Sequence, residues 1–140
     1  MIDFSSIDIN ELNRWGNNTA SEALGIRFIA TGPDWLEASM PVDQRTRQPA
    51  GLLHGGASVL LAETLGSVAG NLCLPDRQKQ ACVGLEINAN HLKGVRDGEV
   101  IGRVSPIHIG RSTQIWEIRI RNAKDDLVCI SRLTLAVINL

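Results

Sequence analysis

One carboxylate lies in the most apolar stretch of the chain, residues 51–74. Glu63 sits near its middle, and no lysine or arginine occurs three or four positions away. Withdrawing an unpaired carboxylate from water costs free energy, so such a group either serves a function or reaches a polar partner at a pocket edge. If it is functional, its surroundings prepare it as a general base or nucleophile. Ser67, one helical turn further on, is placed to orient it or a water molecule.

A His54-Gly55-Gly56 sequence precedes Glu63 in the same stretch. Paired glycines at the start of a helix leave backbone N–H groups uncovered, and the helix N-terminus adds a partial positive charge. Such a site can stabilise the oxyanion that forms on a substrate carbonyl. The alternative is a tight loop in which the glycines serve only backbone geometry and the histidine is structural.

The spacing of these two features predicts a site shared between subunits. If one helix carries both, Gly55 and Glu63 lie roughly 12 Å apart along its axis, too far to touch one carbonyl. Two such helices packed antiparallel across a two-fold axis would bring the N-terminus of one to the carboxylate of the other. The small residues Gly66, Ser67 and Gly70 would then allow close contact between subunits.

Polar and basic side chains gather in two later segments. These are Asn88–Arg96 and His108–Ser112, which could line a pocket mouth or could be ordinary strand-end and turn residues. The three histidines, His54, His91 and His108, have no partner at metal-ligand spacing, so no metal site is expected. The chain also lacks the motifs typical of serine hydrolases and nucleotide-binding enzymes.

Hydrophobic periodicity predicts the elements that position these residues. The apolar residues of 51–74 recur with a helical period on nearly all sides, which indicates a buried helix that Pro75 ends. A short polar helix is expected over Ile9–Gly16, and a β-hairpin over Ile26–Ala30 and Trp35–Pro41.

The last sixty residues change to a period of two, which is typical of strands. Their short connections predict that consecutive strands pair antiparallel, giving an α+β fold in a single domain over residues 1–140. In the first of these strands one continuous apolar face is expected, made of Val83, Leu85, Ile87 and Ala89. The four strands are expected over Cys82–Leu92, Glu99–Ile109, Gln114–Arg121 and Leu127–Ile138.

Composition excludes several classes of protein. The 140 residues are 44% hydrophobic and carry 14 basic against 15 acidic side chains, which argues against disorder and against a nucleic-acid partner. Glu63 in the apolar stretch argues against a membrane span. The N-terminus lacks the pattern of a secretory signal, and the three cysteines form no CxxC pair. We therefore expect a cytoplasmic protein without a membrane partner.

The sequence resembles the hotdog-fold acyl-CoA thioesterases over almost the whole chain after the first helix. In particular it is similar to the bacterial subgroup that includes 1,4-dihydroxy-2-naphthoyl-CoA hydrolase and the enterobactin-pathway proofreading thioesterase. The resemblance implies a long central helix wrapped by a five- or six-stranded antiparallel sheet, assembled into homodimers and commonly homotetramers. The segments that carry it are Met40–Thr46, Gln48–Ser58, Leu61–Thr64, Val83–His91, His108–Arg111 and Ser131–Thr134.

The same resemblance implies a role for each site residue. Glu63 would be the catalytic nucleophile or general base, and the N–H of Gly55 would polarise the thioester carbonyl. Gln48 and His54 would bind and orient that carbonyl, and Ser67 would assist on the attacking side. The residues implied in coenzyme A and acyl binding are Gly84, His91, Leu92, Lys93, Gly94, His108, Ile109, Gly110, Arg111, Ser112 and Thr113.

The function expected from the resemblance is hydrolysis of an aromatic acyl-CoA, such as 1,4-dihydroxy-2-naphthoyl-CoA of menaquinone biosynthesis, to free acid and coenzyme A. No separate cofactor is implied, because coenzyme A is part of the substrate. The subgroup that the chain resembles carries Phe at the position where this chain has Ala50, so the aromatic wall that this Phe would provide for an aryl group is missing. The alternatives are a broad-range medium- or long-chain acyl-CoA hydrolase and a non-catalytic acyl-CoA-binding protein.

Overall fold

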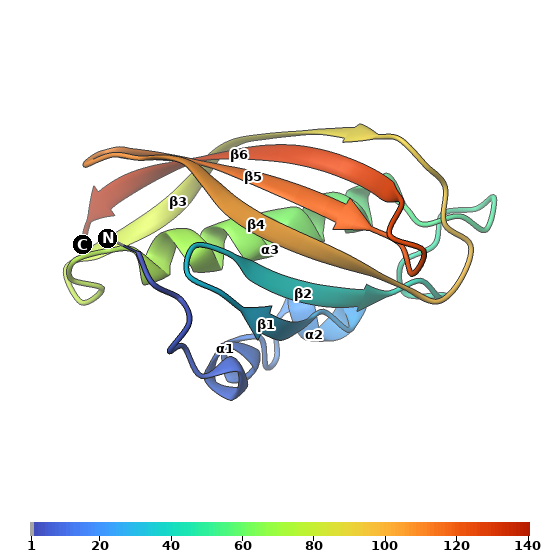
Figure 1. Cartoon of the computed structure of the whole chain (residues 1–140), viewed down its shortest axis with the longest axis horizontal. Coiled ribbons are helices and arrows are strands. Elements are labelled where there is room, and N and C mark those ends of the chain that lie inside the picture. The colour runs from blue at the N-terminus through green and yellow to red at the C-terminus, as the bar shows by residue number, and fades with distance from the viewer. Residues whose placement is uncertain (1) are drawn as a thin grey trace.

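The computed structural model describes residues 2–140 and contains one long helix against a six-stranded antiparallel sheet (Figure 1). The strand order in the sheet is β1-β2-β4-β5-β6-β3. This confirms the predicted α+β fold with a long central helix. The elements are α1 (Ile9–Trp15), α2 (Ala20–Leu24), β1 (Arg27–Thr31), β2 (Leu36–Pro41), α3 (Gly55–Leu72), β3 (Gln80–His91), β4 (Glu99–Ile109), β5 (Thr113–Arg121) and β6 (Leu127–Asn139).

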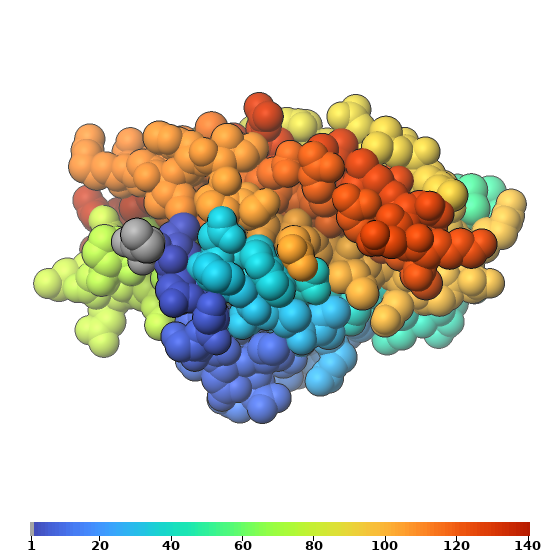
Figure 2. All heavy atoms as spheres, in the orientation of Figure 1, coloured from blue at the N-terminus to red at the C-terminus, as the bar shows by residue number. Residues whose placement is uncertain are grey.

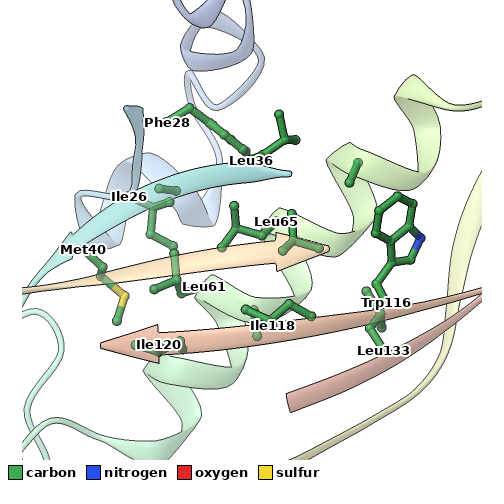
Figure 3. Close-up of a cluster of buried hydrophobic side chains, with 14 of the residues drawn as sticks. Ile26, Phe28, Leu36, Met40, Leu61, Leu65, Trp116, Ile118, Ile120 and Leu133 are labelled. Atoms are coloured by element: carbon green, nitrogen blue, oxygen red, sulfur yellow. The ribbon is translucent and has the colours of Figure 1, made fainter. Parts of the chain in front are cut away.

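Aliphatic side chains of α3 and the sheet build the core (Figure 3). Leu61 and Leu65 on α3 are fully buried, as are Trp116 and Ile118 on β5. Full burial of one such side chain stabilises the fold by about 1.5–3 kcal/mol. The alternating pattern of β5 therefore predicted the buried face of this strand, and the helical pattern of α3 predicted a buried helix.

The glycines of α3 face the sheet of their own chain. A Cβ built on Gly66 would lie 2.4 Å from Leu133 Cδ2, and one on Gly70 would lie 2.4 Å from Leu135 Cδ1. The absent side chains let α3 pack closely on β6. The prediction that Gly66 and Gly70 form a contact between subunits is therefore wrong, because β6 already occupies that space.

The prediction that β3 pairs with β4 is also wrong. β3 pairs with β6, and β4 lies between β2 and β5. The connection between β3 and β4 instead passes the N-terminal end of α3, where the carbonyl of Val95 accepts the Leu53 N–H at 2.7 Å. Hydrophobic periodicity identifies strands but does not say which strands are neighbours.

The apolar face predicted for β3 is interrupted. A register shift between Gly84 and Glu86 changes which residues face α3. Val83 and Leu85 are consequently 40% and 63% exposed, whereas Ile87 remains partly buried against the core. The expectation that all four apolar residues share one face is therefore wrong for Val83 and Leu85.

The N-terminal elements follow their predictions with one addition. α1 begins after Asp8, whose side chain accepts the Asn10 N–H, and the β1–β2 hairpin is antiparallel as expected. The short helix α2 was not predicted; Thr19 caps its N-terminus. Among residues 2–140 no helix is both long enough and apolar enough to cross a membrane.

Candidate active site

Glu63 lines a cavity of about 420 Å³ between α3 and the N-terminal segment. Its side chain is partly buried, and no residue of 2–140 forms a hydrogen bond or ion pair with its carboxylate. The cavity walls are mainly apolar. Besides Glu63, the lining includes Ser67, Leu12, Trp15, Phe28, Leu60 and Val68.

Gly84 of β3 lies directly beside this carboxylate. A Cβ built on Gly84 would come within 2.6 Å of Glu63 Oε1. The missing side chain therefore provides the space in which the carboxylate rests. The structure thus brings together two of the predicted site residues, one from α3 and one from β3.

The two hydroxyl groups next to Glu63, those of Thr64 and Ser67, differ in their hydrogen bonding. The Thr64 hydroxyl donates to the carbonyl of Leu60 at 2.7 Å, so its proton is committed to the helix backbone. The side chain of Ser67 forms no hydrogen bond with residues 2–140, and it lines the same cavity as Glu63. Ser67 is therefore the hydroxyl available to a substrate or to an attacking water.

A second cavity, of about 360 Å³, lies at the N-terminus of α3. Six of the predicted site residues meet here, and they come from three different segments of the chain. They are Gln48, Gly55, His91, Leu92, Lys93 and Gly94.

His54 caps α3 and leaves one N–H group uncovered. Its Nδ1 accepts the N–H of Gly56 at 2.8 Å. The Gly55 N–H finds no acceptor among residues 2–140, so a single amide of the glycine pair is free at the positive end of the helix. The imidazole of His91 lies against Gly55, since a Cβ there would be 2.8 Å from His91 Nε2.

Two neighbouring side chains are held in place from within the chain. The side-chain oxygen of Gln48, Oε1, accepts the Ala50 N–H, which leaves the Gln48 side-chain NH₂ group as a hydrogen-bond donor. Lys93 Nζ lies 2.8 Å from Asp126 Oδ2. The hydrogen bonds from Lys93 and Asn122 lower the pKa of the Asp126 carboxyl below its usual value.

The predicted site residues His108–Thr113 lie elsewhere. They span the end of β4, the turn at residues 110–112 and the first residue of β5, at the opposite end of α3 from Gly55 (Figure 1). Ile109 borders a separate cavity with Leu72 and Cys73. Within one chain, these residues contribute to neither of the two cavities described above. No cluster of three metal-ligating side chains occurs among residues 2–140.

The two ends of the predicted site are separated along α3. Gly55 and Glu63 lie on one continuous helix, eight positions apart and thus roughly 12 Å along its axis. One chain therefore presents a carboxylate in an apolar cavity and, at a distance, an uncovered amide with polar neighbours. Both groups are suited to attack on a carbonyl, and they meet only if a second chain supplies one of them.

Sequence reasoning missed the wall that faces Glu63. Leu12, Trp15 and Phe28 line the cavity from α1 and β1, yet the helix predicted over Ile9–Gly16 was expected only as a short polar element. Trp15 is 41% exposed, and aromatic residues are rare in this chain. An exposed tryptophan in a short polar helix was the available signal.

Comparison with known proteins points to one chemistry. Residues 50–129 match the family described as "Thioesterase superfamily". The chain is 53% identical over 132 residues to 1,4-dihydroxy-2-naphthoyl-CoA hydrolase of Escherichia coli, which covers 94% of this chain and 96% of that protein. It is 50% identical over 129 residues to the proofreading thioesterase EntH of Cronobacter turicensis, with 92% and 93% covered. A Haemophilus influenzae thioesterase structure superposes with a TM-score of 0.94 at 53% identity, covering 100% of this chain and 96% of that one.

Proposed function

The chain belongs to the thioesterase superfamily and is a thioester hydrolase with the hotdog fold, and from this premise we propose that its substrate is an aromatic acyl-CoA. The products are the free acid and coenzyme A. The single observation that most strongly supports hydrolysis at this site is the carboxylate of Glu63, which lies in an apolar cavity with no hydrogen-bond or ion-pair partner among residues 2–140. Water supplies the second reactant, and coenzyme A belongs to the substrate, so the proposal includes no resident cofactor.

Glu63 acts on the thioester carbonyl carbon by one of two routes. As a general base it takes a proton from water, and the resulting hydroxide attacks the carbonyl. As a nucleophile it attacks directly and forms an anhydride that water then cleaves. Either way the carbon–sulfur bond breaks, and the thiolate of coenzyme A takes up a proton. Ser67 lies in the same cavity and can hold the attacking water.

The oxyanion of the tetrahedral intermediate needs a hydrogen-bond donor. The uncovered Gly55 N–H, at the positive end of α3, supplies one. Because Glu63 lies roughly 12 Å away on the same helix, we assign the donor to the partner of a homodimer. Gln48, beside Gly55 in the second cavity, adds its amide N–H group to the same carbonyl.

We infer the chemical class of the acyl group from the apolar cavity around Glu63. Its lining of Trp15, Phe28 and Leu60 accommodates an uncharged ring. The relative named 1,4-dihydroxy-2-naphthoyl-CoA hydrolase makes that thioester the first substrate to test, which would connect the chain to menaquinone biosynthesis. A second candidate is a medium- or long-chain acyl-CoA, because Ala50 is small and exposed where an aromatic wall was expected.

A thiol-release assay over aromatic and aliphatic acyl-CoAs tests the proposal. Glu63→Gln should lower kcat by roughly 10²- to 10⁴-fold, the usual contribution of a general base. Glu86→Gln is the matched control, because among residues 2–140 this exposed carboxylate bonds only to Asn88, and it lies on β3 outside both cavities. Wild-type turnover retained by Glu63→Gln would contradict the catalytic assignment, and binding without turnover by the wild type would favour an acyl-CoA-binding protein.

Isotope labelling tests the nucleophilic route. A single turnover in ¹⁸O-labelled water leaves the label in the Glu63 side chain only if an anhydride forms there and water attacks the glutamyl carbonyl. Label found solely in the released acid is expected for direct attack by water and also for an anhydride that water cleaves at the substrate carbonyl, so label in Glu63 is the outcome that establishes the nucleophilic route. Mass spectrometry of the peptide that contains Glu63 distinguishes these outcomes.

A further inference from the structure

One wall of the cavity around Glu63 comes from the N-terminal segment, and the proposed function does not explain what holds that wall in place. Helix α1 closes the cavity opposite α3, and Leu12, Asn13 and Trp15 all border it. In Figure 2 the N-terminal residues form a continuous surface, drawn in blue, packed beside the cyan hairpin. The width of the cavity is therefore set by how α1 is held.

Asn13 joins α1 to the edge of the sheet. Its Oδ1 accepts the Phe28 N–H at 2.8 Å, and its Nδ2 donates to the Phe28 carbonyl at 3.0 Å. β1 is the outermost strand of the sheet, so Phe28 would otherwise present both backbone groups at an open edge. One side chain thus replaces a neighbouring strand at this point and fixes the distance between α1 and β1.

The far end of α1 carries the aromatic group. Trp15 is 41% exposed, borders the cavity, and has the Arg77 guanidinium 5.5 Å from its ring centroid. The hydroxyl of Thr19, another lining residue, donates to the carbonyl of Gly16 at 2.6 Å. The polar groups of Asn13 and Thr19 are engaged with the backbone, so the ring of Trp15 is the main surface that this wall offers a ligand.

We infer that α1 selects the acyl group: Trp15 contacts the acyl moiety of the substrate, and Asn13 is a positioning residue that sets the width of the cavity. The inference rests on the proposed thioester hydrolysis at Glu63. It adds a specificity element from a part of the chain outside the 50–129 region that matches the family. A wall held at a fixed distance favours flat, rigid acyl groups over flexible chains of similar polarity.

The test compares benzoyl-CoA with butyryl-CoA in the full-length protein. Asn13→Leu keeps the approximate volume and removes both hydrogen bonds to Phe28. The benzoyl-to-butyryl ratio of kcat/KM should fall about tenfold, with most of the change in KM for benzoyl-CoA. Asn10→Leu is the matched control, since Asn10 lies on the same helix and its exposed side chain does not border the cavity.

Trp15→Ala provides a second, independent variant, and the partial exposure of Trp15 means that its removal leaves the core intact. It should lower the same ratio about tenfold. An unchanged ratio in a folded Asn13→Leu or in Trp15→Ala, with Glu63→Gln inactive on both substrates, overturns this inference and leaves the proposed function standing. Full activity of Glu63→Gln overturns the proposed function, and the inference with it.

Discussion

The Glu63 carboxylate occupies the space that a side chain at position 84 would need: a Cβ on Gly84 would lie 2.6 Å from Glu63 Oε1. Real Cβ atoms essentially never approach another heavy atom so closely. A residue with a side chain at position 84 would therefore clash with the Glu63 carboxylate. Glycine is needed here because of where Glu63 lies, and not because of the backbone conformation of β3. A substitution at Gly84 therefore tests whether catalysis needs the Glu63 carboxylate in this position.

Gly84→Ala should displace the Glu63 carboxylate and lower kcat by about 10²-fold, because a misplacement of 1 Å is enough for such a loss. The side chain of Glu63 is flexible, so the fold should survive. The measurements are kcat in the thiol-release assay and Tm by thermal melting. Asn90→Ala on the same strand is the control; its side chain is exposed and forms no hydrogen bond with the described chain. Unchanged kcat in Gly84→Ala would show that the carboxylate acts from another position.

Much of the fold could be predicted because the patterns were local. The helical period of residues 55–72 and the alternation of β5 each reflect one buried face, and both elements formed as expected. The pairing of β3 with β6 could not be predicted, since it depends on a loop that crosses the end of α3. The bulge near Leu85 also left no signature in the alternation of polar and apolar residues.

Single residues of the candidate site could be predicted from the sequence, but their arrangement in space could not. Glu63 and Gly55 were identified from the cost of a buried carboxylate and from the amides at a helix start. That His54 caps Gly56 is a local contact between residues two positions apart, whereas the contact of His91 with Gly55 requires two segments distant in sequence to fold together. The wall containing Trp15 was missed because Ile9, Leu12 and Trp15 recur at helical spacing over only seven residues, which does not show what this short apolar face packs against.

Close contact between Gly55 and His91 predicts an energetic coupling. Gly55→Ala keeps the backbone N–H but places a Cβ 2.8 Å from His91 Nε2, so the imidazole must move and activity should fall. His91→Ala removes the obstacle. The double variant should therefore lose less than the product of the two single losses, with a coupling free energy of about 0.5–3 kcal/mol from kcat/KM. Strictly multiplicative losses would mean that the two residues act independently.

The thiol of Cys73 should make stability depend on pH in the alkaline range. Burial raises the pKa of Cys73 from 9.0 to about 11, with the neighbouring Cys82 adding to the effect. Between these values the folded chain keeps a proton that the unfolded chain has lost, so the free energy of unfolding falls as pH rises through the interval. Thermal melts from pH 8 to 11 should show a steeper fall in Tm for the wild type than for Cys73→Ala.

Alkylation gives an independent check on Cys73. Because the thiolate is the reactive form, iodoacetamide at pH 8.5 should modify Cys73 at least about tenfold more slowly in the folded chain than in the urea-unfolded chain. Peptide mass spectrometry measures both rates. Equal rates would contradict the raised pKa.

The packing of α3 on β6 predicts that Gly66→Ala destabilises the fold. The added methyl would lie 2.4 Å from Leu133 Cδ2, and overpacking of this kind typically costs about 1–3 kcal/mol. Urea unfolding measures the loss. Ser67→Ala is the control for stability, because Ser67 is the next residue of the helix and borders the cavity instead of β6. A change in subunit association without any loss of stability would restore the rejected role of Gly66 in a subunit contact.

Complementation between inactive chains tests the shared site. Glu63 and Gly55 lie roughly 12 Å apart on α3, so in a homodimer each site should take its carboxylate from one chain and its amide from the other. Glu63→Ala and Gly55→Pro, which removes the amide N–H, should each be inactive alone. Pro is tolerated at the first position of a helix, so Gly55→Pro should still fold. Co-expressed with different affinity tags at equal levels, the two chains form mixed dimers with one intact site each, and about a quarter of wild-type activity should return.

The control combines two differently tagged Glu63→Ala chains, which cannot form an intact site. Mixed dimers that are purified by both tags yet remain inactive would show that each chain builds its site alone.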